Sequence, residues 1–117
     1  MDERRQFGVN LLKPSERVVV VALEGEVDIH SSRQFKEALV RSIADGATRV
    51  IIDLAKVTFV DSTALGVMVS GLRAVGAHDG TLDIICCDEH IRSIFEITRL
   101  DRIMHVYRSR DEALAAA

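Results

Sequence analysis

The sequence predicts an α/β fold, in which a mixed, mostly parallel sheet of about five strands is covered by about four helices. Apolar runs alternate along the chain with segments of helical periodicity, in the order β-β-α-β-α-β-α-β-α. One run, Val18 to Leu23, is a mostly β-branched stretch typical of a strand buried on both faces. The 117 residues, 48% of them hydrophobic, predict a single domain over residues 1–117 with its core at about 5–116.

The first part of the chain is predicted to form two strands and a helix. Phe7, Val9 and Leu11 alternate with other residues as in a half-exposed strand, and residues 14–16 are typical of a turn. The run Gly25 to Asp28 closes the second strand. The helix is expected to begin at Ser31 or Ser32, with Ser31 and Gln34 at capping-box spacing. It should end at Asp45-Gly46, and its expected inner face is Phe35, Ala38, Leu39 and Ile43.

The middle of the chain is predicted to form the third strand and the second helix. Val50 to Leu54 form the strand, and Val57, Phe59 and Val60 lead to a second helix that runs to about Ala77. The residues expected to face the sheet from this helix are Ala64, Leu65, Met68, Leu72 and Val75. Those expected on the opposite side are Ser62, Gly66, Ser70 and Arg73, with Val67 and Val69 forming an apolar rim beside them.

The last third is predicted to add two strands and two helices. A turn at residues 78–80 precedes a strand over Leu82 to Cys86, and Asp88 is placed to cap the third helix. The inner face of that helix is expected to be Ile91, Ile94, Phe95 and Thr98. Ile103 to Val106 should form a short last strand, and Ser109 with Glu112 has capping-box spacing for a C-terminal helix.

Polar residues follow the three central strands. Right-handed crossovers place the carboxyl ends of parallel strands along one edge of the sheet, where α/β proteins carry their functional sites. That edge is expected to gather Asp28, the run Asp61-Ser62-Thr63, and Cys87-Asp88. Ser62 would lie at a helix N-terminus, where a phosphate finds unpaired amides and a partial positive charge. The alternative is that Asp61 or Ser62 only caps the helix.

Composition argues against several classes of function. A net charge of -3 and an aromatic content of 4% do not favour nucleic acid or an anionic membrane as a partner. No apolar segment follows the charged run Met1 to Arg5, so we expect no signal peptide. A cytoplasmic location is expected instead. Adjacent Cys86 and Cys87 are interpreted as packing residues. The scattered histidines His30, His78, His90 and His105 do not predict a metal site, and no cofactor is expected.

An enzyme is the main alternative class to a binding module. The chain contains neither the G-x-G-x-x-G run of dinucleotide-binding domains nor the phosphate-binding G-x-x-x-x-G-K-[ST] run. No histidine stands near Ser62 in the sequence to serve as a base. These patterns favour a non-enzymatic protein, and they leave open whether Ser62 accepts a phosphate or only caps the helix.

Three runs together resemble a bacterial STAS domain, and more narrowly the stand-alone anti-sigma factor antagonists. They are Gly25-Glu26-Val27-Asp28, Ile52-Asp53-Leu54 and Phe59 to Gly66, which reads F-V-D-S-T-A-L-G. The resemblance extends from about Val18 to the C-terminal helix. One departure is Ala64, where many members of the family have glycine.

The resemblance implies a partner-switching cycle. The unphosphorylated protein would bind an anti-sigma factor that is also a serine/threonine kinase, and so release the sigma factor. The kinase would then phosphorylate Ser62, or alternatively Thr63, and a serine phosphatase would reset the protein. The implied partner surface comprises Asp28, Asp61, Ser62, Thr63, Gly66, Val67 and Ser70. A STAS module that only serves as a scaffold in a larger sensory complex is the other interpretation.

Overall fold

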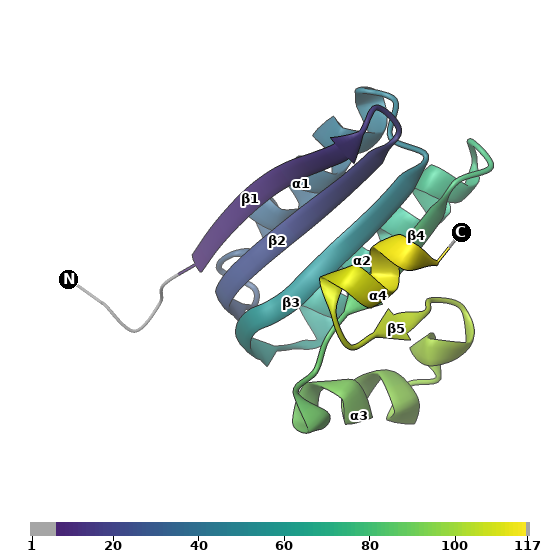
Figure 1. Ribbon diagram of the computed structural model, residues 1–117. Helices are drawn as coiled ribbons and strands as arrows, with labels where there is room; N and C mark the ends of the chain where they lie inside the picture. Colours follow the sequence, from purple (N-terminus) through teal and green to yellow (C-terminus); the bar gives the residue numbers. More distant parts are fainter. Residues whose placement is uncertain (1–6, 117) are drawn as a thin grey trace.

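A five-stranded sheet forms the centre of the molecule, with two long helices on one face and a short helix on the other (Figure 1). The computed structural model describes residues 7–116, so the charged run Met1 to Arg5 lies outside the described residues. The strands are β1 (Phe7–Ser15), β2 (Val18–Val27), β3 (Arg49–Val60), β4 (Thr81–Ile85) and β5 (Val106–Tyr107). The helices are α1 (Ser32–Ala44), α2 (Ser62–Gly76), α3 (Glu89–Ile97) and α4 (Arg110–Ala115), with a 3₁₀ turn, η1, at Leu100–Arg102.

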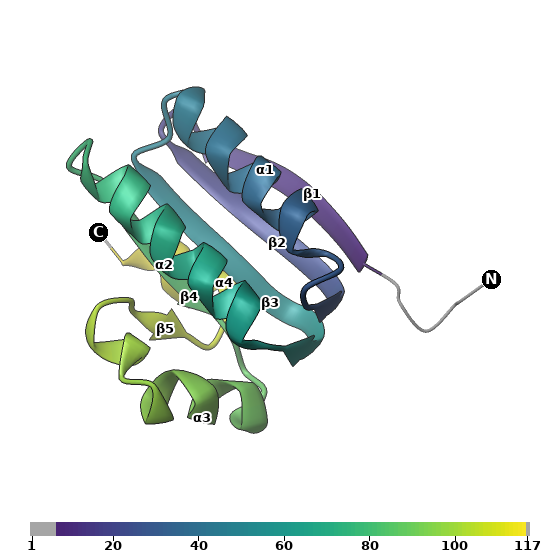
Figure 2. The same cartoon turned by 180° about the vertical axis from the view of Figure 1, so that it is seen from behind.

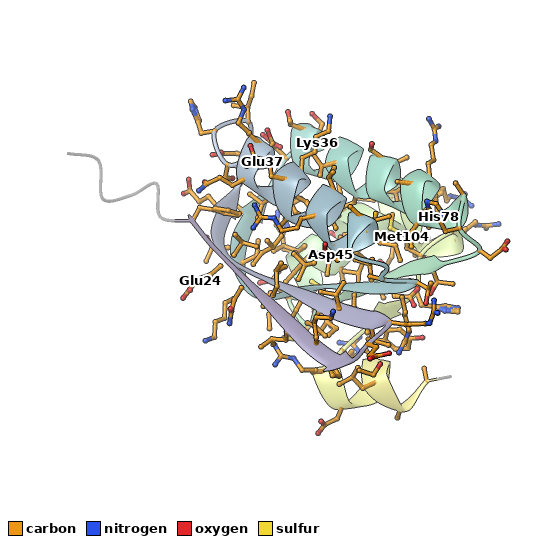
Figure 3. The ribbon with its side chains drawn as sticks, turned by 90° about the horizontal axis from the view of Figure 1, so that it is seen from above. Glu24, Lys36, Glu37, Asp45, His78 and Met104 are labelled. Atoms are coloured by element: carbon orange, nitrogen blue, oxygen red, sulfur yellow. The ribbon has the colours of Figure 1, made fainter. Side chains whose placement is uncertain are left out.

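The sheet follows the order of the chain, β1-β2-β3-β4-β5. β1 is antiparallel to β2, and the pairs from β2 to β5 are parallel. α1 and α2 lie side by side over one face, and α4 crosses the other face (Figures 2 and 3). The predicted mixed, mostly parallel α/β architecture is therefore confirmed, with the carboxyl ends of β2, β3 and β4 along one edge. We call this edge the carboxyl edge.

β3 is longer than predicted because it continues through two bulges. Its register against β2 shifts first between the pairs Ala22–Asp53 and Glu24–Lys56, and again between Gly25–Val57 and Glu26–Phe59. Each shift adds one residue to β3, so the alternation of faces is interrupted twice. The side chains buried with the main core are consequently Val50, Ile52, Leu54, Val57 and Val60, whose spacing lengthens from two residues to three.

Two apolar clusters hold the layers together. The larger cluster lies under α1 and α2 and includes Phe35, Leu39, Met68 and Phe95, each of which is almost fully buried. The smaller cluster lies on the opposite face, and its buried members are Val20, Ile51, Ile85 and Ala113. Ala113 brings α4 onto this face, and the Arg49 Nη2 atom donates a hydrogen bond of 2.6 Å to its carbonyl oxygen.

Gly71 lets α2 approach both α1 and the sheet. A Cβ atom at Gly71 would stand 3.0 Å from a methyl of Leu39 and 3.1 Å from a methyl of Leu82. Gly66 differs, because a Cβ atom there would meet nothing within 4 Å. Gly66 and Gly71 therefore lie on different sides of the helix.

Several predicted boundaries were wrong. β1 continues through Pro14 to Ser15, so the turn is at residues 16–17. β4 begins and ends one residue earlier than predicted, and the last strand lies at Val106–Tyr107 because residues 103–105 form the turn after η1. On α3 only Ile91 and Phe95 are buried, whereas Thr98 is exposed.

Candidate functional site

The carboxyl edge brings together three strand-to-helix junctions. The β2–α1 and β3–α2 junctions are adjacent, because Val27 pairs with Val60 and the Asp61 amide donates to the Val27 carbonyl at 3.3 Å. The β4–α3 junction follows the next strand (Figure 1). The sequence predicted this gathering of Asp28, Asp61 to Thr63, and Cys87-Asp88.

At the β3–α2 junction the helix is capped by Asp61 rather than by Ser62. The Asp61 backbone is extended, and its Oδ1 atom accepts a hydrogen bond of 3.0 Å from the Ala64 amide. The Asp61 carbonyl also accepts the first intrahelical bond, from the Leu65 amide at 3.1 Å. Ser62 is consequently the first residue inside the helix, where backbone amides have no intrahelical partner. The sequence left open whether Asp61 or Ser62 caps the helix, and the structure shows that Asp61 is the cap.

The Ser62 side chain faces solvent at the positive end of α2. Ser62 is exposed, and among residues 7–116 nothing forms a hydrogen bond with its hydroxyl. Thr63, the next residue, is half-buried. The hydroxyl of Ser62 is therefore accessible and unused, while the helix end that would stabilise an attached anion is already formed.

A small-residue surface continues from Ser62 along α2. Gly66 and Ser70 are exposed, as predicted, and Val69 is half-buried beside them. Val67 was expected at the exposed rim, but this expectation was wrong, because its side chain is only 9% exposed and belongs to the main core. The buried side of α2 is turned toward α1 more than the helical periodicity indicated, which also leaves Leu65 and Leu72 half-buried.

The β2–α1 junction places a buried aspartate beside this surface. Asp28 is 8% exposed, and its Oδ1 atom accepts hydrogen bonds from the amides of His30 at 2.8 Å and Ser31 at 3.3 Å. The Ser31 hydroxyl accepts from the Asp28 amide at 3.0 Å and donates to the Glu26 carbonyl at 2.8 Å. Ser31 precedes α1 but makes no side-chain capping bond, so the predicted capping box was wrong. Its hydroxyl holds the loop closed instead.

Ile29 is a surface residue that the sequence analysis missed. Its side chain is 67% exposed although it lies in the loop between the buried residues Asp28 and Ser31. A large apolar side chain in an otherwise polar turn was the available signal.

The β4–α3 junction is capped as predicted but contains no serine. The Asp88 Oδ1 atom accepts from the Ile91 amide at 2.9 Å. Arg108 donates to Glu89 at 2.8 Å, and this hydrogen bond and charge lower the pKa of Glu89 and raise that of Arg108.

The two cysteines of this junction differ. Cys86 is buried, and this burial raises the pKa of its thiol, which disfavours the reactive thiolate. Cys87 is exposed, so its interpretation as a packing residue was wrong.

The chemistry that the described residues offer is limited. Within residues 7–116 no group of three or more His, Cys, Asp or Glu side chains could hold a metal ion. Over the same residues, no helix is long and apolar enough to cross a membrane. A hollow of about 490 Å³, lined in part by Gly8, Ala22 and Arg110, lies on the other face of the sheet and is separate from Ser62.

Comparison with known proteins assigns the family. A model of the STAS domain matches residues 11–113. The chain belongs to the STAS domain family. An anti-sigma-B factor antagonist from Staphylococcus epidermidis is 37% identical over 86 residues, which cover 74% of this chain and 80% of that relative. A Staphylococcus aureus protein of the same name is 35% identical over the same shares.

Solved structures agree with this fold. The crystal structure of an anti-sigma factor antagonist from Mycobacterium paratuberculosis superposes with a TM-score of 0.88 at 22% identity, covering 99% of this chain and 97% of that one. The Bacillus cell fate determinant SpoIIAA in its phosphorylated form gives a TM-score of 0.74 at 22% identity, covering 92% and 97%. At these identities the likeness shows the fold alone, and the predicted single STAS domain is confirmed by the family model.

Proposed function

We propose that this STAS protein is an anti-sigma factor antagonist whose partner-binding surface is centred on Ser62. The observation that carries the proposal is the exposed Ser62 hydroxyl at the first position of α2, where Asp61 already serves as the cap. Relatives at 35–37% identity bear the name of anti-sigma-B factor antagonists, which supports the same role here. The partner is an anti-sigma factor, and its capture releases a sigma factor for transcription in the cytoplasm.

The partner is also a serine/threonine kinase that phosphorylates Ser62. A phosphate there gains hydrogen bonds from the amides of the first helical turn and a favourable interaction with the helix dipole. It adds a charge of about -1.5 to -2 near pH 7. Because Asp61 caps the helix independently, the fold tolerates this charge without rearrangement. A serine phosphatase then restores the unmodified protein.

The switch acts on the surface rather than on the fold. Ser62, Gly66 and Ser70 form an exposed stripe whose small side chains permit close approach by the partner backbone. Asp61 and Asp28 give the surrounding edge an acidic character. A phosphate added to this surface would be desolvated and repelled in the complex, so phosphorylation dissociates it. Thr63 contributes a second hydroxyl, but its half-buried position makes Ser62 the better acceptor.

Binding measurements with two Ser62 variants test the proposal. We expect Ser62→Ala to bind the cognate anti-sigma kinase like the wild type, and Ser62→Asp to lose binding. Ser15→Asp is the matched control, because it adds the same charge at an exposed serine beside the β1–β2 turn. Equal binding of the two Ser62 variants would contradict the switch and favour the scaffold interpretation.

A phosphorylation assay tests the acceptor directly. After incubation with the kinase and ATP, mass spectrometry of the peptide spanning residues 61–66 should place the phosphate on Ser62, and Ser62→Ala should remain unmodified. Phosphate on Thr63 in the wild-type protein would move the switch to the neighbouring residue. The absence of phosphate from both residues, with a kinase that binds, would refute the phosphoswitch.

A further inference from the structure

Among residues 7–116, the outer edge of β1 is a long strand edge without a partner in the sheet. β1 comes first in the strand order and pairs only with β2, so one side of its nine residues faces away from the sheet. The opposite edge is different, because β5 contains only two residues. Figure 2 shows β1 as the outermost strand, with α1 over the neighbouring part of the sheet. An open edge of this length is a template for pairing with another strand.

The features that usually protect such an edge are confined to one end of β1. Lys13 and Pro14 lie next to the β1–β2 turn, and the register against β2 is irregular only between Leu12 and Ser15. The preceding residues, Phe7 to Leu12, include no charged side chain and no proline. Two thirds of the strand therefore lack the charge, proline or bulge that prevents edge-to-edge association.

The apolar side chains at this edge are incompletely covered. Val9 and Leu11 are each 37% exposed, although they lie on the face of β1 that α1 covers. Leu11 lines a small hollow together with Val19 and Ser42, which fixes this side of the strand. The other side carries Gly8, Asn10 and Leu12, and Leu12 packs on the smaller core cluster. The partly exposed side chains of Val9 and Leu11 therefore lie beside the open backbone edge of β1.

We propose that β1 pairs antiparallel with β1 of a second copy of this chain, about a two-fold axis at Asn10. In this register Val9 of each copy lies opposite Leu11 of the other copy, on the face of the sheet that α1 covers. Lys13 stands opposite Phe7, so no two like charges meet. A register centred on Asn10 uses the whole stretch from Phe7 to Lys13 and stops before Pro14, which lacks an amide hydrogen. The interface is isologous, as in most homodimers.

The proposed dimer does not require the proposed sigma-factor function and does not obstruct it. α2 packs on α1, β3 and β4, and α1 separates it from β1 (Figure 2). Both copies would therefore present Ser62 outward on one continuous sheet. Ser62→Asp should leave dimerisation unchanged, so failure of either proposal is distinguishable from failure of the other.

Sedimentation velocity of the full chain tests the association. The wild type should sediment as a dimer whose population falls on dilution, and Leu11→Lys should sediment as a monomer with an unchanged circular dichroism spectrum. Val40→Lys is the matched control, because Val40 is 57% exposed on α1 and lies outside the proposed interface. A wild type that is monomeric at every concentration, or an equal effect of the two variants, would overturn the proposal.

A cysteine cross-link tests the register. In a Cys87→Ser background, Asn10→Cys places two thiols opposite each other across the two-fold axis, with Cα atoms about 5 Å apart. Mild oxidation should convert most of this variant to a covalent dimer. Lys13→Cys is the control, because its two copies would lie about 20 Å apart at roughly 3.4 Å per residue. Equal cross-linking of the two variants would refute the pairing.

Discussion

The β2–α1 and β3–α2 junctions each place an aspartate directly after a parallel strand and a serine shortly after that aspartate. The two serines nevertheless differ in their roles. Ser31 is buried, and its hydroxyl bonds the Glu26 carbonyl and the Asp28 amide inside the loop. Ser62 is exposed, because Asp61 alone caps α2. One serine maintains the structure, and the other is left available for chemistry.

The difference shows what makes a hydroxyl available at a helix start. When a serine is the capping residue, its hydroxyl oxygen accepts a hydrogen bond from a backbone amide of the first helical turn. A serine one residue further on does not make this hydrogen bond when the side chain of the preceding residue makes it. A short acidic side chain before the serine is therefore the structural condition for a modifiable helix terminus.

The largest effect is expected where the buried hydroxyl is removed. Ser31→Ala leaves the Asp28 amide and the Glu26 carbonyl without this partner, which should reduce the free energy of unfolding by about 1–3 kcal/mol. Ser62→Ala removes no internal bond and should change it by less than about 0.5 kcal/mol. Urea unfolding of the two variants measures the difference, and equal losses would contradict the contrast between the junctions.

Removal of the α2 cap should have the next largest effect. Asp61→Ala should reduce the free energy of unfolding by about 1 kcal/mol, because the Ala64 amide loses its acceptor. Asp61→Asn retains a good cap and should cost only a fraction of that amount. Asp88→Ala is a useful comparison, since Asp88 makes the equivalent bond at α3. A negligible loss for Asp61→Ala would mean that Ser62 can take over the cap.

A negative charge on Ser62 should affect stability less than it affects binding. Ser62→Asp places an anion at the helix N-terminus, where the dipole favours it, while Asp61 repels it. We expect the free energy of unfolding to rise by up to about 0.5 kcal/mol in urea titrations at low salt. A loss larger than about 1 kcal/mol would indicate that the switch acts through the fold rather than the surface.

The smallest effect concerns the third junction. The pKa of Glu89 is lowered in the folded protein by Arg108, so the pair stabilises the fold above the carboxyl's ordinary pKa of about 4.3. This contribution is lost as the pH falls through the lowered folded-state pKa. Glu89→Gln should therefore be slightly less stable than wild type at neutral pH and equal to it in acid. Glu96→Gln, at an exposed glutamate of the same helix, is the matched control for the substitution itself.

Local patterns were sufficient to predict the fold and the exposed position of Ser62. Alternating strand and helix periodicities predicted the architecture, and the helical period placed Ser62 and Gly66 on the outer side of α2. The same period misplaced Val67, because it does not show which neighbour a helix leans against. The buried arc of α2 is shifted toward α1, where a Cβ atom at Gly71 would stand 3.0 Å from a methyl of Leu39.

The roles of individual hydroxyl groups were harder to predict. Ser31 has the spacing of a capping box, but its partner is the Glu26 carbonyl of the preceding strand. Sequence spacing identifies bonds within a helical turn and does not identify bonds across a loop. Ile29 was missed for a related reason, since its exposure follows from the way Asp28 and Ser31 close that loop.

The two bulges of β3 determine the orientation at which the chain enters α2. Loss of one residue between Asp53 and Asp61 would exchange the inward and outward positions for the rest of the strand, and would turn Val60 away from the main core. The spacing between these two aspartates is consequently expected to resist insertion and deletion, whereas the β1–β2 turn has no such constraint. Strand length in this segment, as much as residue identity, is what directs Ser62 to solvent.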